Sequence, residues 1–73
     1  MKWKLYEWDC DNGDMLYREY YKSKKDALAV LKEYIKDAKE DGWECEWIDA
    51  DRVICNKCEE GECYQRELGV EPA

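Results

Sequence analysis

A single amphipathic helix, bordered on both sides by strand-forming runs, is the feature that most constrains how this chain can fold. Ser23 is suited to cap the start of the helix, with Asp26 at the third helical position, and Gly42 is suited to end it. Between these residues the apolar side chains recur every three or four positions and form one stripe: Ala27, Leu28, Leu31, Tyr34, Ile35 and Ala38. The pattern predicts a helix over residues 23–42 whose stripe packs against another layer.

Residues 1–22 are predicted to form a β-hairpin. Trp, Tyr and Leu are abundant on both sides of Asn12-Gly13, and this dipeptide favours a two-residue type I′ turn because both positions require a positive φ. Such a turn sets Trp8 opposite Tyr17 and leaves apolar side chains on both faces of the hairpin.

A second hairpin is predicted over residues 43–57, where apolar and charged residues alternate. Its register has two solutions. A three-residue turn sets Cys45 opposite Cys55, whereas a four-residue turn sets Trp47 opposite Ile54.

Residues 58–73 contain two glycines and no clear periodicity, and we expect an irregular, cysteine-containing tail. The predicted fold is therefore α+β, in ββαββ order, with residues 1–73 forming one small domain. It has a four-stranded antiparallel sheet with the helix packed on one face.

One helix covers only one face of a sheet, so part of the first hairpin should stay exposed unless the tail folds over it. Exposed apolar side chains on a sheet are a contact surface for a partner protein or for a second copy in a homodimer. The set expected to be exposed is Trp3, Leu5, Leu16 and Tyr20, or otherwise Tyr6, Trp8, Tyr17 and Tyr21.

The absence of histidine and threonine, with Ser23 as the only serine, argues against enzymatic chemistry. It excludes an imidazole base, a Ser-His-Asp triad and a histidine-ligated metal, and it leaves almost no hydroxyl nucleophile. We therefore assign no catalytic residue and expect a protein that is not an enzyme.

The net charge of −7 belongs to the C-terminal half of the chain. Residues 1–36 have a net charge of +1, whereas residues 37–73 have a net charge of −8. This half should attract a protein with a basic surface and repel nucleic acid. The predicted contact residues are its clustered carboxylates: Glu40, Asp41, Glu44, Glu46, Asp49, Asp51, Glu59, Glu60 and Glu62.

In size and acidity the chain is similar to small phage and mobile-element proteins that block host nucleic-acid enzymes, anti-CRISPR proteins among them. The resemblance is one of class, because no motif of a particular family is present. It implies a viral, nucleic-acid-mimicking inhibitor in the cytoplasm of the host cell. Met1 to Cys10 lacks the apolar core of a signal peptide, and no segment approaches the roughly 20 apolar residues of a membrane span. We therefore expect a cytoplasmic protein without membrane contact.

The five cysteines allow a second interpretation, a stabilised structural domain. Cys55 and Cys58 form a C-x2-C pair, and with Cys63 and either Cys45 or Cys10 they would supply four thiolates to zinc, the one cofactor considered. In an oxidising compartment, disulfides between Cys45 and Cys55 and between Cys58 and Cys63 are the alternative.

A basic cluster at the junction of the first hairpin and the helix gives a third interpretation, weak binding of single-stranded nucleic acid. It consists of Arg18, Lys22, Lys24 and Lys25, with tyrosines interleaved. Because the whole chain is acidic and nucleic-acid affinity depends chiefly on neutralising phosphates, we expect these charges to be solvated instead.

Overall fold

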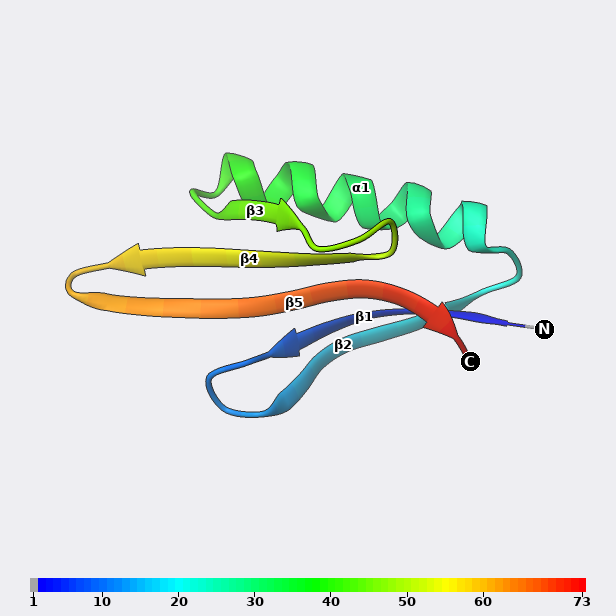
Figure 1. Cartoon of the computed structure of the whole chain (residues 1–73), viewed down its shortest axis with the longest axis horizontal. Coiled ribbons are helices and arrows are strands. Elements are labelled where there is room, and N and C mark those ends of the chain that lie inside the picture. The colour runs from blue at the N-terminus through cyan, green and yellow to red at the C-terminus, as the bar shows by residue number, and fades with distance from the viewer. Residues whose placement is uncertain (1) are drawn as a thin grey trace.

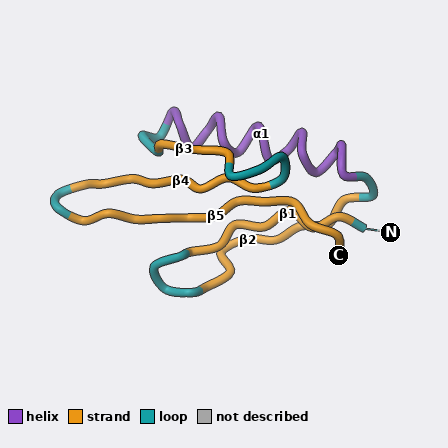
Figure 2. The backbone as a smooth tube through the Cα atoms, in the orientation of Figure 1, coloured by secondary structure: helices purple, strands orange, loops and turns teal. Residues whose placement is uncertain are grey.

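Helix α1 lies across one face of a five-stranded antiparallel sheet in the computed structural model, which describes residues 2–73 (Figure 1). The strand order across the sheet is β2-β1-β5-β4-β3. In chain order the elements are β1 (Trp3–Asp9), β2 (Asp14–Tyr21), α1 (Lys24–Glu40), β3 (Glu44–Trp47), β4 (Arg52–Glu59) and β5 (Glu62–Pro72). Figure 2 shows short loops that join neighbouring elements. The predicted α+β class with one helix is confirmed, whereas the predicted number of strands is wrong.

Strand β5 accounts for that error. Residues 62–72 are not an irregular tail but the central strand, paired with β1 on one side and with β4 on the other. Gly69 looks like a strand breaker in the sequence, yet it lies under the ring of Tyr6, where a Cβ atom would come within 2.6 Å of the Tyr6 hydroxyl oxygen. This glycine permits close packing and does not end the strand, so the predicted four-stranded sheet has five strands.

The helix begins and ends where the sequence indicates. The Ser23 hydroxyl oxygen accepts a hydrogen bond from the backbone N–H of Asp26 at 3.1 Å. At the other end, Gly42 has a φ of +95°, and the backbone N–H groups of Gly42 and Trp43 donate to the carbonyls of Lys39 and Ala38. This pair of bonds is a Schellman motif, which requires the left-handed conformation that glycine adopts without strain. Within residues 2–73, α1 is too short and too polar to be a membrane span.

The core lies between α1 and the sheet face that it covers, which we call the helix face. Its buried residues come from the helix and from β1, β4 and β5: Leu5, Ala27, Leu31, Ile35, Val53, Cys55, Leu68 and Val70. The strands alternate, so the opposite side of the sheet, the open face, receives the residues between them. Nothing among residues 2–73 covers the open face as α1 covers the helix face.

The register of the first hairpin differs from the prediction. Asp9 pairs with Asp14 and Trp8 with Met15, and the pairing then shifts by one residue at a β-bulge. The Asp9 carboxylate explains the longer turn, because it accepts hydrogen bonds from the backbone N–H groups of Asp11 and Asn12. A side-chain cap of this kind stabilises a four-residue turn in place of the two-residue type I′ turn.

The second hairpin has the three-residue turn, and Cys45 lies opposite Cys55. Its turn is closed by a hydrogen bond from the Ile48 N–H to the Arg52 carbonyl at 2.9 Å. Beyond the helix, β4 and β5 continue as a projecting hairpin (Figure 1). No helix covers this tip, and the disulfide between Cys58 and Cys63 joins its two strands there.

A candidate binding groove at the C-terminus of the helix

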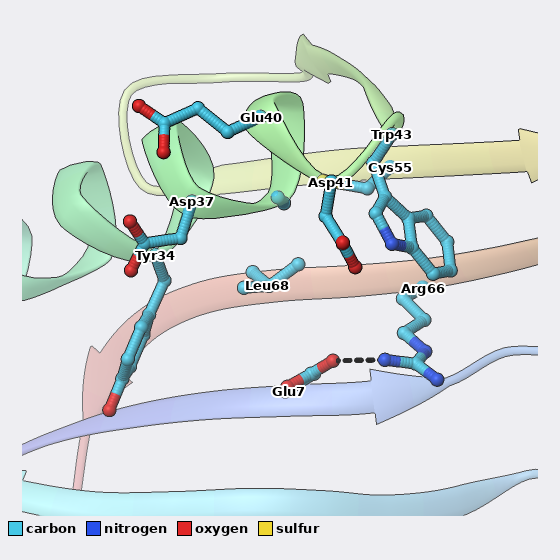
Figure 3. A pocket seen from close by; sticks show the side chains of 10 residues that line it. Glu7, Tyr34, Asp37, Glu40, Asp41, Trp43, Cys55, Arg66 and Leu68 are labelled. Carbon is cyan, nitrogen blue, oxygen red and sulfur yellow. Dashed lines mark hydrogen bonds and ion pairs between the residues drawn. The ribbon is translucent and has the colours of Figure 1, made fainter.

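A cavity of about 460 Å³ opens between the last turns of α1 and the helix face of the sheet (Figure 3). Side chains of α1, of the segment that follows it and of three strands surround it: Glu7, Tyr34, Asp37, Ala38, Glu40, Asp41, Trp43, Cys55, Arg66 and Leu68. We call this cavity the acidic groove, because four of these side chains are carboxylates and one is a guanidinium.

The rim of the acidic groove is formed by Asp37, Glu40 and Asp41 at the end of α1. The helix dipole places a partial negative charge at this terminus, so cations stabilise the last turn and carboxylates destabilise it. Lys39 is the one basic residue of that turn. Three acidic residues therefore lie where local helix stability disfavours them.

The inner wall of the groove is held by Arg66 on β5. Its guanidinium carbon lies 4.8 Å from the centre of the Trp43 ring, and its Nη1 atom donates to Glu7 Oε2 at 3.0 Å. A cation stacked on an indole and paired with a carboxylate has little freedom to turn toward the rim. Lys57 lies over the same indole at 5.9 Å and 3.9 Å from Asp41.

The floor of the groove is apolar, with Leu68 and Cys55 both at most 5% exposed. Burial, followed by the neighbouring Cys45 thiol, raises the pKa of Cys55, so this sulfur is a poor nucleophile at neutral pH. Tyr34 forms one side and packs edge-on against Tyr17, with ring centres 5.5 Å apart. The arrangement suits binding of a cationic group with an apolar stem and offers no activated nucleophile.

The predicted acidic residues do not form one continuous surface. Two of them, Glu40 and Asp41, lie on the groove rim. Glu59, Glu60 and Glu62 lie at or beside the turn between β4 and β5, toward the same end of the molecule (Figure 1).

The other four predicted carboxylates lie on or after β3. The strand register places Glu44 and Glu46 on the open face of this edge strand. Asp49 and Asp51 lie in the following turn, where they pair with Arg52 at 2.9 Å and Lys24 at 3.0 Å, respectively. Hydrogen bonds from the Asp51 backbone and from Arg52 lower the pKa of Asp49, as expected for a turn residue that stays charged.

The predicted apolar contact set is divided by the bulge in β2. Leu5 is wholly buried in the core, so its assignment as a contact residue was wrong, and Trp3 packs partly buried against that core. Leu16 and Tyr20 are 45% and 50% exposed and remain available to a partner. The shifted register causes this division, because odd-numbered residues of β1 pair with odd-numbered residues of β2 beyond the bulge.

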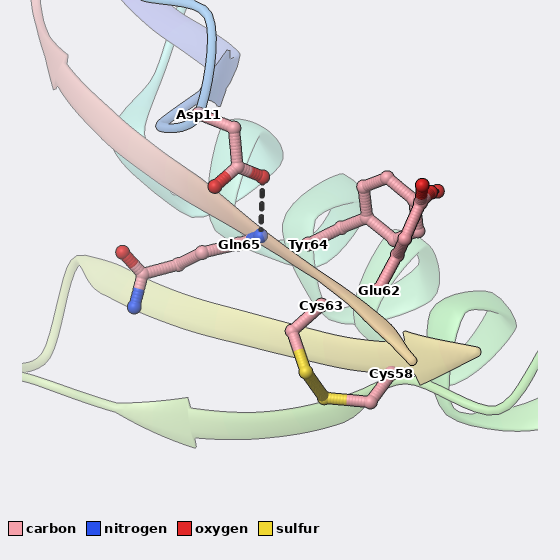
Figure 4. Close-up of a disulfide and its surroundings, with 6 residues drawn as sticks. All are labelled: Asp11, Cys58, Glu62, Cys63, Tyr64 and Gln65. Carbon is pink, nitrogen blue, oxygen red and sulfur yellow. Dashed lines mark hydrogen bonds between the residues drawn. A yellow bond between two sulfur atoms is a disulfide. The ribbon is translucent and has the colours of Figure 1, made fainter. Parts of the chain in front are cut away.

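The predicted zinc site is not formed. Cys45 and Cys55 point to the helix face, whereas Cys58 and Cys63 are on the open face and are bonded to each other (Figure 4). Among residues 2–73, no three or more Cys, Asp or Glu side chains are arranged to hold a metal ion. Residues three apart on one strand face opposite sides, as Cys55 and Cys58 do. The sequence analysis missed this because it ended the second hairpin at residue 57, whereas β4 continues to Glu59.

The basic cluster is also divided. Lys24 pairs with Asp51 and lies 5.5 Å from the centre of the Trp3 ring. Arg18 belongs to β2, opposite Tyr6, whereas Lys22 and Lys25 lie beyond that strand, in the connection to the helix and in its first turn. The cluster therefore offers no continuous track for a phosphate backbone.

Seven groove residues were missed as site residues by the sequence analysis: Glu7, Tyr34, Asp37, Ala38, Trp43, Arg66 and Leu68. Asp37 could have been found, because it lies one helical turn before Asp41 and therefore on the same side of α1. Glu7 and Arg66 are 59 positions apart and meet only because β5 pairs with β1. No local pattern indicates that contact.

No protein-family profile, curated protein or solved structure matches the chain. The fold and the acidic groove therefore define the protein only by class, as a small α+β protein with a charged groove beside its helix. Its functional proposal depends on the chemistry of that groove.

Proposed function

We propose that the protein is a small, non-enzymatic binding module whose acidic groove takes up a basic side chain of a partner protein. The observation that supports this most is the rim, where Asp37, Glu40 and Asp41 all lie near the negative end of the helix dipole. Residues that oppose local stability are expected where a functional site needs them. A partner with a positively charged surface would offset their mutual repulsion.

The lining of the groove matches a lysine or arginine side chain. The rim carboxylates supply charge for the head group, and Tyr34 and Leu68 supply apolar surface for the methylene stem. Among residues 2–73, Asp37 and Glu40 form no ion pair, whereas Glu7 is already paired with Arg66. Asp41 lies 3.9 Å from Lys57, so Asp37 and Glu40 are the rim carboxylates that can pair with a basic group of a partner.

The specific form of the proposal is inhibition of a nucleic-acid-binding protein, as in the small acidic inhibitors of phage. Glu59, Glu60 and Glu62 lie at or beside the turn between β4 and β5 and extend the negative charge beyond the groove. Carboxylates spread along one end of a small domain can occupy a basic channel and exclude the nucleic acid that binds there.

Titration with a fluorescent arginine-rich peptide tests the proposal, with a glutamate-rich peptide and a single-stranded DNA as comparison probes. Neutralising the rim in the triple variant Asp37→Asn, Glu40→Gln, Asp41→Asn should weaken binding of the basic peptide by about tenfold or more. Raising the salt concentration should weaken binding to the unmodified protein as well.

A matched control separates the groove from net charge. The triple variant Asp14→Asn, Glu44→Gln, Glu46→Gln removes the same number of charges from exposed positions outside the groove and away from the turn between β4 and β5. It should weaken binding by less than about threefold. Equal losses in the two variants would show that total charge decides binding, and no binding of the basic peptide by the unmodified protein would contradict the proposal outright.

A further inference from the structure

The thiols of Cys45 and Cys55 face each other across β3 and β4 at a distance that separate sulfur atoms do not ordinarily keep. Their Sγ atoms are 2.6 Å apart, although no bond joins them. Carbon atoms in contact stay about 3.5–4 Å apart, and sulfur is larger. A disulfide bond is about 2.05 Å long, so the two sulfurs are closer to bonding distance than to contact distance.

The backbone geometry also supports a disulfide between these two cysteines, independently of the distance between their sulfur atoms. Cys45 and Cys55 are directly opposed in an antiparallel pair. Such residues have Cα atoms about 4.5–5.5 Å apart, which lies within the range of about 4.4–6.8 Å that a disulfide accepts. Cys58 and Cys63, the pair already bonded, are also directly opposed, across β4 and β5.

We propose that Cys45 and Cys55 are the site of a second disulfide, formed by exchange with a low-molecular-weight disulfide such as glutathione disulfide. Strand β4 would then be joined to β3 through Cys55 on the helix face and to β5 through Cys58 on the open face. This inference does not depend on what the acidic groove binds.

The exchange has two steps. The Cys45 thiolate attacks one sulfur of glutathione disulfide, forms a mixed disulfide and releases one glutathione thiolate. Cys55 then loses its proton, and its sulfur attacks Cys45 Sγ and expels the second glutathione thiolate. Two protein thiols are oxidised, and one glutathione disulfide is reduced to two thiols.

The bond would fix the weakest strand of the sheet. Strand β3 has only four residues, lies at the edge and pairs with β4 alone. Short edge strands open locally more readily than central ones. With Cys45 bonded to the 1%-exposed Cys55, β3 and its glutamates Glu44 and Glu46 would be held in the sheet. External reductants should reach the exposed Cys58–Cys63 bond first.

The experiment oxidises the full chain with glutathione disulfide to equilibrium, unfolds it and alkylates it. Mass spectrometry then counts the modified thiols, which are those that carry either the alkyl group or a glutathione adduct. We expect one modified thiol per chain, Cys10. Trypsin places Cys45 in residues 40–52, Cys55 in residues 53–57 and both remaining disulfide cysteines in residues 58–66. A linked peptide of residues 40–52 with residues 53–57 is the expected product. Three modified thiols, or a link to Cys10, would overturn the proposal.

Two variants control the assignment. Cys10→Ser should leave no modified thiol after oxidation, and two modified thiols in this variant would contradict the proposal. Cys45→Ser should leave both Cys10 and Cys55 modified while the bond between Cys58 and Cys63 persists. If loss of Cys45 prevents folding, the Cys10→Ser measurement still decides, because it retains both members of the pair.

Discussion

The two faces of the sheet are built from the same strands but from different kinds of contact. On the helix face, Leu5, Val53 and Val70 are at most 3% exposed beneath α1. On the open face, Trp8 and Met15 form a cross-strand pair and are still 37% and 38% exposed. Apolar burial therefore stabilises the fold mainly from one side. The other side is held by strand pairing, ion pairs and the contact of Tyr6 with Gly69, which leaves it free to meet other molecules.

The largest expected effect compares one substitution at two positions of the same hairpin. Leu5→Ala should lower the free energy of unfolding by about 2–5 kcal/mol, because it leaves a cavity in the core. Leu16→Ala, at a position 45% exposed, should change it by no more than about 0.5 kcal/mol. Urea unfolding of both variants measures the difference. Similar losses would mean that Leu16 is also buried in solution and that the open face is covered.

The second largest expected loss of stability comes from disturbing the close contact between Tyr6 and Gly69 on the open face. Gly69→Ala should destabilise the protein by about 1–3 kcal/mol, because the new methyl group would come within 2.6–2.9 Å of Tyr6 atoms. The double variant with Tyr6→Leu isolates the cause: on that background the added methyl should cost much less. If Gly69→Ala costs the same in both backgrounds, the ring of Tyr6 is not what requires a glycine.

A third effect, about 1 kcal/mol, belongs to the Tyr6 hydroxyl, which donates a hydrogen bond to Glu67 Oε2. Burial, and then this carboxylate, raise the pKa of Tyr6 above its ordinary value of 10.0. Because the folded pKa is the higher one, this stabilisation is complete below pH 10 and is lost as pH rises through the folded pKa. Tyr6→Phe should therefore be less stable than the unmodified protein at pH 8 and should lose less stability above pH 10, as measured by unfolding at both values. Parallel pH profiles would contradict this explanation.

The difference between the faces also explains what the sequence could predict. The helix boundaries depend on Ser23 and Gly42, so local chemistry was sufficient to predict them. For the second hairpin the sequence left two registers open, and the structure has the one that opposes Cys45 and Cys55. It was not sufficient for β5, because Gly69 is explained only by a ring that is 63 positions earlier in the chain.

The candidate groove could likewise be predicted only in part, because some of its residues are neighbours in the sequence and others are brought together by strand pairing. Its rim lies on one helix and could be read from the spacing of Asp37 and Asp41, whereas its inner wall needs the pairing of β5 with β1. The bulge after Met15 is the remaining case. A one-residue shift there moves every later side chain of β2 to the other face. The Asp9 carboxylate, which competes with the Asn12-Gly13 turn signal, explains only the longer turn, and that turn moves the pairing by two residues and keeps the predicted faces.

The smallest predicted effect is the contribution of ion pairs to stability, and it tests whether this contribution also differs between the two faces. Strands β1 and β5 are joined by two ion pairs of nearly equal length, Lys4 to Glu71 at 2.9 Å on the open face and Arg66 to Glu7 at 3.0 Å on the helix face. All four side chains keep contact with water, so each pair should contribute less than about 1 kcal/mol and weaken as salt is added. Double-mutant cycles with Lys4→Met and Glu71→Gln, and with Arg66→Met and Glu7→Gln, measure the two coupling energies. Values within about 0.5 kcal/mol of each other would leave apolar burial as the feature that separates the faces. A much larger value for Arg66 and Glu7 would show instead that the groove wall is electrostatically isolated from solvent and that its charges are held more strongly than their exposure suggests.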